Sequence, residues 1–137
     1  MKIEFLENGS PDCPLLRIYG TERGDFGLLH QALRPLGEGE GRCCRIDEVS
    51  GFQPLDGCSL TAFSCSQTAG VHRDEEALRF DWMLTPAKWL IVAGLVGPFA
   101  QGFQDGRHQW LSGREAAFGL ELGDIGVVLS WSGDGQW

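Results

Sequence analysis

Two segments of the chain alternate large apolar side chains with other residues at every second position. Residues 78–84 carry four apolar side chains in this pattern, and residues 125–131 repeat it. A period of two is typical of a strand in an antiparallel sheet that buries one face. Shorter apolar stretches between turn-forming residues predict further strands. The full set of expected strands is 2–7, 14–20, 43–49, 58–65, 78–84, 108–111 and 124–131.

Two segments have helical spacing instead. The first is expected over residues 22–34, with Thr21 as its N-cap and Pro35 ending it. The second is expected to begin with Thr85 as N-cap and Pro86 at the first helical position, and to end near Gly97-Pro98. Its sequence is apolar on almost every side, which predicts that it is the more deeply buried of the two helices.

The two halves of the chain have the same expected order of elements. Residues 14–66 and residues 78–132 each show a strand, a Thr N-cap, a helix, a Pro, a Gly-rich loop, an Arg and two further strands. The corresponding residues are Thr21 and Thr85, Pro35 and Pro98, Arg42 and Arg107, and Leu60 and Ile125. This order suggests a tandem βαββ pseudo-repeat. Because few residues are identical, coincidence in a turn-rich chain is the alternative.

These elements predict a single α+β domain over residues 1–137. We expect a mainly antiparallel sheet of six to seven strands, with both helices on one face. The core is expected from the apolar positions of these elements. Its predicted members are Phe5, Leu16, Ile18, Phe26, Leu29, Leu33, Ile46, Phe80, Trp82, Leu90, Ile91, Val127 and Leu129.

Charge narrows the range of partners. Eleven basic and nineteen acidic side chains give a net charge of −8. Nucleic acids and anionic membranes attract basic surfaces, so neither is expected as a partner. The longest apolar run, residues 89–100, is too short to span a bilayer, and the N-terminus lacks the pattern of a secretion signal. We therefore expect a cytoplasmic protein, with its five cysteines present as free thiols.

Metal ligands are the first chemistry to consider, because the chain has three histidines and five cysteines. No pair of cysteines has the C-x₂₋₄-C spacing of a structural zinc site. His72 and Asp74, in the run 72–76, form the most metal-like segment, although a solvated turn between two strands explains it better. His108 lies on a short expected strand, where a surface position is the simpler interpretation. No metal or other cofactor is expected.

Nucleophilic catalysis has no clear signal either. The chain lacks a G-x-S-x-G motif and a phosphate-binding glycine loop. Cys65 is the best thiol candidate, but a strand supplies no positive charge to lower its pKa. His30 lies at the edge of the first helix's apolar stripe, which favours a packing role. Trp137 at the C-terminus either folds back on the sheet or is exposed as an anchor for a partner.

The function expected from these observations is binding rather than catalysis. We expect a small acidic, non-enzymatic protein that binds another protein, as an immunity protein or a regulatory protein would, with a basic partner. A small-molecule-binding domain or an enzyme, with its site at the seam between the two βαββ units, is the alternative. A homodimer formed by edge strands is the third hypothesis. The candidate binding residues are His72, Asp74, His108 and Trp137.

Overall fold

A computed structural model of the chain describes residues 1–74, 77–102 and 108–132. The fold is α+β, as expected, with two helices and nine strands in these described ranges. The strands are β1 (Lys2–Leu6), β2 (Leu15–Gly20), β3 (Cys43–Arg45), β4 (Gln53–Pro54), β5 (Ser59–Ser64), β6 (Gly70–Arg73), β7 (Arg79–Leu84), β8 (His108–Ser112) and β9 (Gly126–Trp131). The helices are α1 (Arg23–Glu38) and α2 (Pro86–Ala100), and the short 3₁₀ turns are η1 (Ile46–Glu48) and η2 (Leu55–Gly57).

The strands form two mixed sheets, so the expectation of one mainly antiparallel sheet of six to seven strands is wrong. The five-stranded sheet has the order β4-β1-β2-β9-β8, and the four-stranded sheet has the order β3-β5-β7-β6. Each sheet contains a parallel central pair, β2 with β9 and β5 with β7. Antiparallel strands flank both pairs, and β4 adds a short parallel pairing with β1. The tandem repeat itself stays a prediction.

The central strands of the five-stranded sheet explain why the antiparallel interpretation failed. All six residues of β9 are buried, and so are the first five residues of β2. Strands buried on both faces are typical of parallel pairs in the middle of a sheet. The alternation over residues 125–131 captured one face of β9, but Val128 and Ser130 on its other face are buried as well.

Two strands had no recognisable signal in the sequence. β4 has only two residues, and one of them is Pro54, which lacks a backbone donor. β6 begins at Gly70 with a φ of 78°, and it continues into polar residues that resemble a turn. His72 therefore belongs to a strand, not to the solvated turn expected over residues 72–76. Conversely, the expected strand 43–49 ends at Arg45, and η1 begins at the next residue, Ile46.

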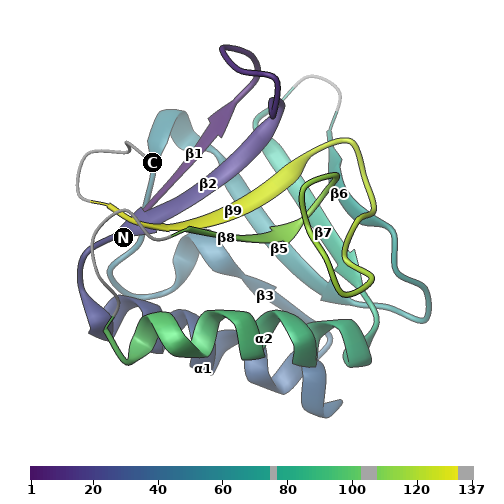
Figure 1. The fold of residues 1–137 in the computed structure, drawn as a ribbon. Helices are drawn as coiled ribbons and strands as arrows, with labels where there is room; N and C mark the ends of the chain where they lie inside the picture. The colour runs from purple at the N-terminus through teal and green to yellow at the C-terminus, as the bar shows by residue number, and fades with distance from the viewer. Residues whose placement is uncertain (75–76, 103–107, 133–137) are drawn as a thin grey trace.

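Both helices lie side by side in one layer against the two sheets (Figure 1). The start of α2 is confirmed: Thr85 is its N-cap, and the hydroxyl of Thr85 accepts a hydrogen bond of 3.4 Å from the Lys88 backbone N–H. The expected N-cap of α1 is wrong. Glu22 occupies that position instead of Thr21, and it makes no side-chain capping bond.

The expected ends of both helices are wrong as well. α1 continues through Pro35 to Glu38, and α2 continues through Pro98 to Ala100. A proline inside a helix leaves the carbonyl four residues earlier without its usual N–H donor. Those carbonyls belong to Gln31 and Gly94, which are both exposed. Water can bond to each of these carbonyls. Both helices therefore continue beyond the proline, which lies in the final turn of each.

Aromatic rings join the two sheets and the helices into one core. Phe5 of the five-stranded sheet and Phe80 of the four-stranded sheet have ring centroids 4.7 Å apart. The Phe26 ring of α1 stacks on Trp131 of β9, with centroids 5.2 Å apart. Leu90, which was expected in the core, is 51% exposed. α2 is therefore not buried on all sides, despite its apolar sequence.

None of the helices in the described ranges is long and apolar enough to cross a membrane.

Candidate functional site

The four-stranded sheet buries one face and leaves the other in solvent. Its inner side chains, including Leu60, Phe80 and Trp82, are fully buried or nearly so. The side chains between them on the same strands point outward and are exposed or half-buried. We call this outer surface the open face; it is formed by Arg45, Ser59, Thr61, His72, Arg79 and Asp81.

Strand register aligns four of these polar side chains across the open face. Arg45 of β3 is paired with Thr61 of β5, and Thr61 is paired with Asp81 of β7. Asp81 is in turn paired with His72 of β6. Neighbours in such a row have Cβ atoms about 5 Å apart. The row therefore places a guanidinium, a hydroxyl, a carboxylate and an imidazole next to one another.

A polar groove of about 340 Å³ lies on this surface. Its walls are six hydrophilic residues from β3, β5, β7 and the turn after β6. They are Arg45, Ser59, Thr61, Asp74, Arg79 and Asp81. Such a wall suits a polar or charged group of a partner better than an apolar one, because polar atoms keep hydrogen bonds there.

Most charges in the groove already have partners within the chain. Arg79 forms an ion pair with Asp74. The Arg45 guanidinium lies 2.7 Å from an Asp47 carboxylate oxygen. Asp81 is the exception, because its carboxylate has no hydrogen bond or ion pair with any residue in the described ranges. Among its described residues, the groove consequently offers one uncompensated negative charge, that of Asp81.

Arg45 is held in place by a buried carboxylate. Hydrogen bonds from Arg45 to Asp47, followed by the charge of Asp47, raise the pKa of the guanidinium above its ordinary value. Asp47 is only 8% exposed and also accepts a bond of 2.9 Å from the Leu60 N–H. Arg45 is therefore paired with Asp47 and does not form an ion pair with Asp81.

The candidate binding residues proposed from the sequence do not lie together, because those that the structure describes belong to different sheets. His72 lies on the open face, beside Asp81, and Asp74 lies in the adjoining groove. His108 begins β8 in the other sheet, opposite Ser130 of β9. Trp137 lies outside the described residues. Asp81 was missed as a site residue; its only sequence signal was a polar position in the alternating strand 78–84.

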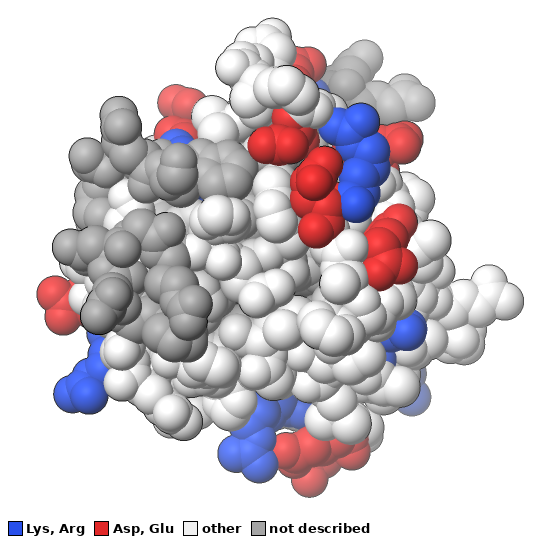
Figure 2. Space-filling model, viewed as in Figure 1, with Lys and Arg blue, Asp and Glu red and all other residues white. Residues whose placement is uncertain are grey.

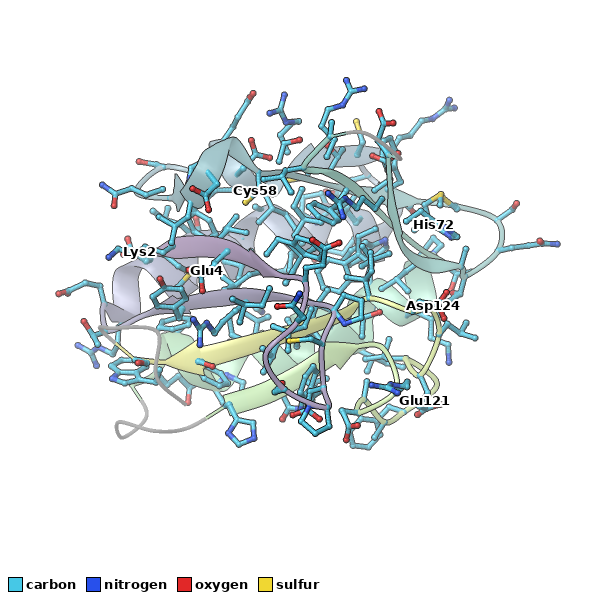
Figure 3. The ribbon with its side chains drawn as sticks, turned by 90° about the horizontal axis from the view of Figure 1, so that it is seen from above. Lys2, Glu4, Cys58, His72, Glu121 and Asp124 are labelled. Atoms are coloured by element: carbon cyan, nitrogen blue, oxygen red, sulfur yellow. The ribbon has the colours of Figure 1, made fainter. Side chains whose placement is uncertain are left out.

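The end of β6 that carries His72 lies against the segment before β9. Val71 forms an isolated bridge with Ile125, and Asp124 is the neighbouring residue. Figure 3 shows His72 and Asp124 at the same end of the molecule. Both side chains are exposed. This end therefore adds a further carboxylate near the margin of the open face.

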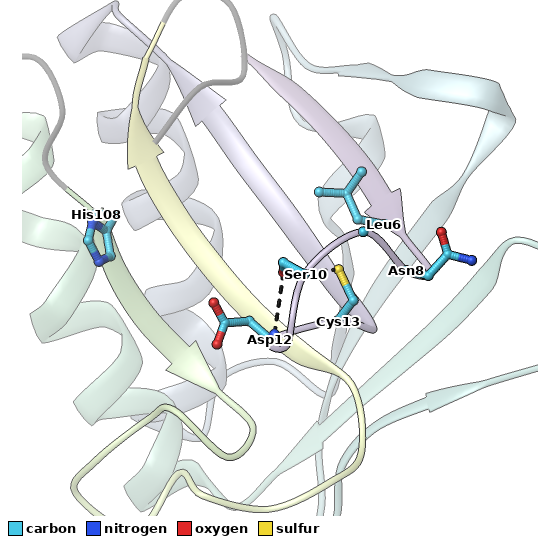
Figure 4. A pocket seen from close by; sticks show the side chains of 7 residues that line it. Leu6, Asn8, Ser10, Asp12, Cys13 and His108 are labelled. Carbon is cyan, nitrogen blue, oxygen red and sulfur yellow. Dashed lines mark hydrogen bonds between the residues drawn. The ribbon is translucent and has the colours of Figure 1, made fainter.

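A second, larger cavity lies beside the turn between β1 and β2 (Figure 4). It has a volume of about 590 Å³. The turn supplies most of the lining, and β8 supplies His108 from the other side. Among the described residues proposed from the sequence as binding residues, His108 alone lines this cavity. Asp12 and Cys13 also line it, and neither was proposed from the sequence as a binding residue.

Three further thiols and the remaining histidine, His30, are partly or fully buried. Burial raises the pKa of the Cys58 and Cys44 thiols, which disfavours the nucleophilic thiolate. Cys65 is half-buried just after β5. His30 is half-buried next to Gly97 of α2. Across the described ranges, no three His, Cys, Asp or Glu side chains are grouped closely enough to hold a metal ion.

Comparison of the chain with protein-family models, with curated proteins and with solved structures finds no match.

Proposed function

We propose that this protein is a binding protein that recognises a basic partner protein through the open face of its four-stranded sheet. The observation that carries this proposal is the Asp81 carboxylate. It lies in a polar groove, next to His72, without an ion-pair partner among the described residues. A lysine or arginine of the partner would supply the missing positive charge.

The overall charge supports the same choice of partner. A net charge of −8 attracts basic proteins over long distances and repels acidic ones. The open face also favours a basic partner, because carboxylates of this chain already neutralise Arg45 and Arg79 and leave Asp81 unpaired among the described residues. Hydrogen-bonding groups such as Thr61 flank Asp81 and would orient the incoming side chain. An immunity or regulatory role fits a small protein of this kind.

Charge reversal at Asp81 tests the proposal. The wild-type protein and the Asp81→Lys variant are immobilised and exposed to native lysate over a series of salt concentrations. Glu115→Lys is the matched control, because Glu115 is exposed in the segment after β8 and lies outside the groove. We expect one basic protein to bind wild type and the control. Its affinity for Asp81→Lys, measured with the purified partner, should be at least roughly tenfold weaker.

Two outcomes would count against this function. In the first, the captured protein binds Asp81→Lys as tightly as it binds wild type, which would place the contact elsewhere. In the second, no basic protein is captured at any salt concentration. The amide spectrum of each variant, compared with that of wild type, shows that a loss of binding is not a loss of folding.

Self-association is a second candidate, favoured by the outer face of α2. Ala87, Leu90, Gly94 and Pro98 follow one another at helical spacing on this face, and all are exposed. Figure 2 shows a broad uncharged area on the lower front of the molecule, where Figure 1 places α2. A second copy of this chain would present the same uncharged surface, whereas a basic partner would gain no ion pair there. This surface suits the expected homodimer better than the short edge strands.

Sedimentation over a wide concentration range tests the dimer. Leu90→Glu should yield a monomer wherever wild type is dimeric, because a carboxylate would be buried in the contact. Leu122→Glu is the control, since Leu122 is 44% exposed but lies in the loop before β9. A monomeric wild-type protein at every concentration would contradict this second candidate without affecting the first.

We also propose that residues 14–66 and 78–132 are related units that exchange strands. Each unit begins with one member of a parallel central pair, β2 or β7, and ends with a member of the other pair, β5 or β9. Each helix follows the first of these strands. The contact between Phe5 and Phe80 fills part of the space between the sheets. The alternative function is a small-molecule site at the seam between the two units.

A further inference from the structure

The turn between β1 and β2 forms one wall of a cavity that the proposed partner-binding surface does not include. The cavity lies on the five-stranded sheet, whereas the open face belongs to the four-stranded sheet. Its volume of about 590 Å³ is within the range of small-molecule sites, roughly 300 to 1,000 Å³. A ligand there would leave the open face free.

Hydrogen bonds hold this turn in a defined shape. The Ser10 hydroxyl accepts a bond of 3.3 Å from the Asp12 N–H, and the Ser10 carbonyl accepts one of 3.2 Å from the Cys13 N–H. From across the sheet, the Arg114 guanidinium donates a bond of 2.7 Å to the Pro11 carbonyl. The Pro14 carbonyl accepts from Gly126 of β9 at 3.1 Å. A wall fixed in this way loses little freedom when a ligand binds.

The charge in the cavity is negative. Asp12 is half-buried and supplies the single carboxylate among the described lining residues. It has no ion pair with any residue in the described ranges, and the guanidinium of Arg114 is bonded to the Pro11 carbonyl instead. Figure 4 shows the Asp12 carboxylate on the side of the turn that faces His108. A half-buried carboxylate without a counter-ion favours a cationic ligand.

The remaining lining residues define what surrounds that cation. Leu6 supplies an apolar surface at the end of β1, and the Gly9 backbone adds another. Asn8 and His108 supply polar side chains on different sides of the cavity. We propose that this cavity binds a small organic molecule with a protonated amine on an apolar frame. The ammonium pairs with Asp12, the frame packs on Leu6, and His108 closes the far side.

Three indole compounds that differ in one group test the proposal directly. Tryptamine carries an ammonium, tryptophol a hydroxyl, and indole-3-acetate a carboxylate, on the same apolar frame. Each is titrated into the full-length protein while amide and imidazole resonances are followed by NMR. We expect tryptamine to shift the resonances of the turn 8–13 and of His108. Tryptophol should bind at least tenfold more weakly, and indole-3-acetate should cause no saturable shift.

A variant of Asp12 then tests whether its carboxylate binds the ammonium of tryptamine. Asp12→Asn should weaken tryptamine binding at least tenfold, whereas tryptophol binding should change little. Glu7→Gln is the matched control, because Glu7 lies on the same turn but does not line the cavity. Equal binding of all three compounds, shifts confined to other regions, or unchanged tryptamine affinity in Asp12→Asn would each overturn the proposal. So would the absence of any saturable shift with tryptamine. None of these results would affect binding of a basic partner at Asp81.

Discussion

The carboxylate of Asp47 accepts a hydrogen bond of 2.9 Å from the backbone N–H of Leu60, which ties η1 to β5. The same carboxylate accepts bonds of 2.7 and 3.3 Å from the guanidinium of Arg45. Asp47 is 8% exposed and its bond to Leu60 is buried, so that bond operates with little competition from water, whereas the Arg45 side chain is 48% exposed. This pair explains how a buried charge is accommodated immediately beneath the proposed binding surface.

Replacing Asp47 by alanine should therefore destabilise the protein. The Leu60 N–H would lose its acceptor inside the structure, which costs about 2 kcal/mol. Urea denaturation measures the change in the free energy of unfolding. Glu48→Ala is the control, because Glu48 is exposed and pairs with the same Arg45 at 3.0 Å. The control should cost less than about 0.5 kcal/mol. Equal losses in the two variants would show that the Leu60 bond is not the cause.

Trp82 and Trp89 provide a second matched comparison. Their rings meet edge to face, with centroids 4.8 Å apart, and both residues are fully buried. The indole N–H of Trp89 donates to the Phe63 carbonyl at 2.8 Å. The indole N–H of Trp82 is buried without an acceptor among the described residues.

Substitution of each tryptophan by phenylalanine should separate the hydrogen bond from the ring packing. Both variants lose similar ring volume, but only Trp89→Phe leaves the Phe63 carbonyl without its donor. Trp89→Phe should thus be less stable than Trp82→Phe by about 1 kcal/mol. The measurement is the difference between their urea unfolding free energies. A larger loss for Trp82→Phe would refute the assigned role of the Phe63 bond.

The sequence was sufficient to predict structural features whose physical cause lies within a few neighbouring residues. The start of α2 was predicted correctly because a Thr N-cap and a following Pro act within one helical turn. The ends of both helices were not, because a proline can be accommodated in a final helical turn where the structure around it tolerates the ring and the freed carbonyl reaches water. That condition depends on the exposure of Gln31 and Gly94, which the sequence does not reveal.

Sheet architecture and the candidate sites depend on distant pairings. Leu15 pairs with Gly126, more than a hundred residues along the chain, and this pairing makes the centre of the sheet parallel. Alternation indicates which side chains share a face, but it does not indicate which strand lies alongside. For the same reason His72 and Asp74 were noticed as an isolated run. Their association with Asp81 required the register of β6 and β7.

Two glycines in the helices should respond in opposite ways to alanine. A Cβ on Gly94 would have no atom within 4 Å, whereas a Cβ on Gly37 would lie 2.9 Å from the Leu90 backbone nitrogen. Gly94→Ala should stabilise the protein by about 0.5 to 1 kcal/mol, because alanine restricts the unfolded chain. Gly37→Ala should destabilise it by about 1 to 3 kcal/mol, because the helices must separate. Thermal unfolding at low protein concentration compares the two; shifts of the same sign would contradict this packing.

The position of Pro98 leads to a further prediction. Because α2 already extends to Ala100, Pro98→Ala should not lengthen the helix or disturb β8. The new N–H could bond to the Gly94 carbonyl, which would add up to about 1 kcal/mol of stability. Far-ultraviolet circular dichroism should be unchanged, and the melting temperature should be equal or higher. A lower melting temperature would show that the proline is required to shape the helix end.

Cys58 should make stability depend on alkaline pH. Its thiol donates to the Ile3 carbonyl at 3.4 Å, and the residue is 1% exposed. Burial, followed by the negative charge of Asp47, raises the pKa of this thiol above its ordinary value. The folded state consequently holds the thiol proton more tightly than the unfolded state does. This contribution is fully present below the unfolded pKa, about 8.5, and is lost as the pH rises through the folded pKa.

Comparison of wild type with two cysteine variants isolates the contribution of the Cys58 thiol to the pH dependence of stability. Above about pH 8.5, the free energy of unfolding of wild type should fall more steeply than that of Cys58→Ala, which has no thiol to deprotonate at this position. Cys43→Ala should keep the wild-type slope, since Cys43 is exposed. The half-buried Cys44, whose pKa is also raised by burial, is present in both wild type and Cys58→Ala and cancels in that comparison. Cys58→Ala also loses packing in the core, which lowers its free energy of unfolding by the same amount at every pH. That loss does not change the slope of the free energy with pH, so it does not mimic the effect of thiol ionisation. Parallel slopes for wild type and Cys58→Ala would show that the buried thiol ionises as readily as an exposed one.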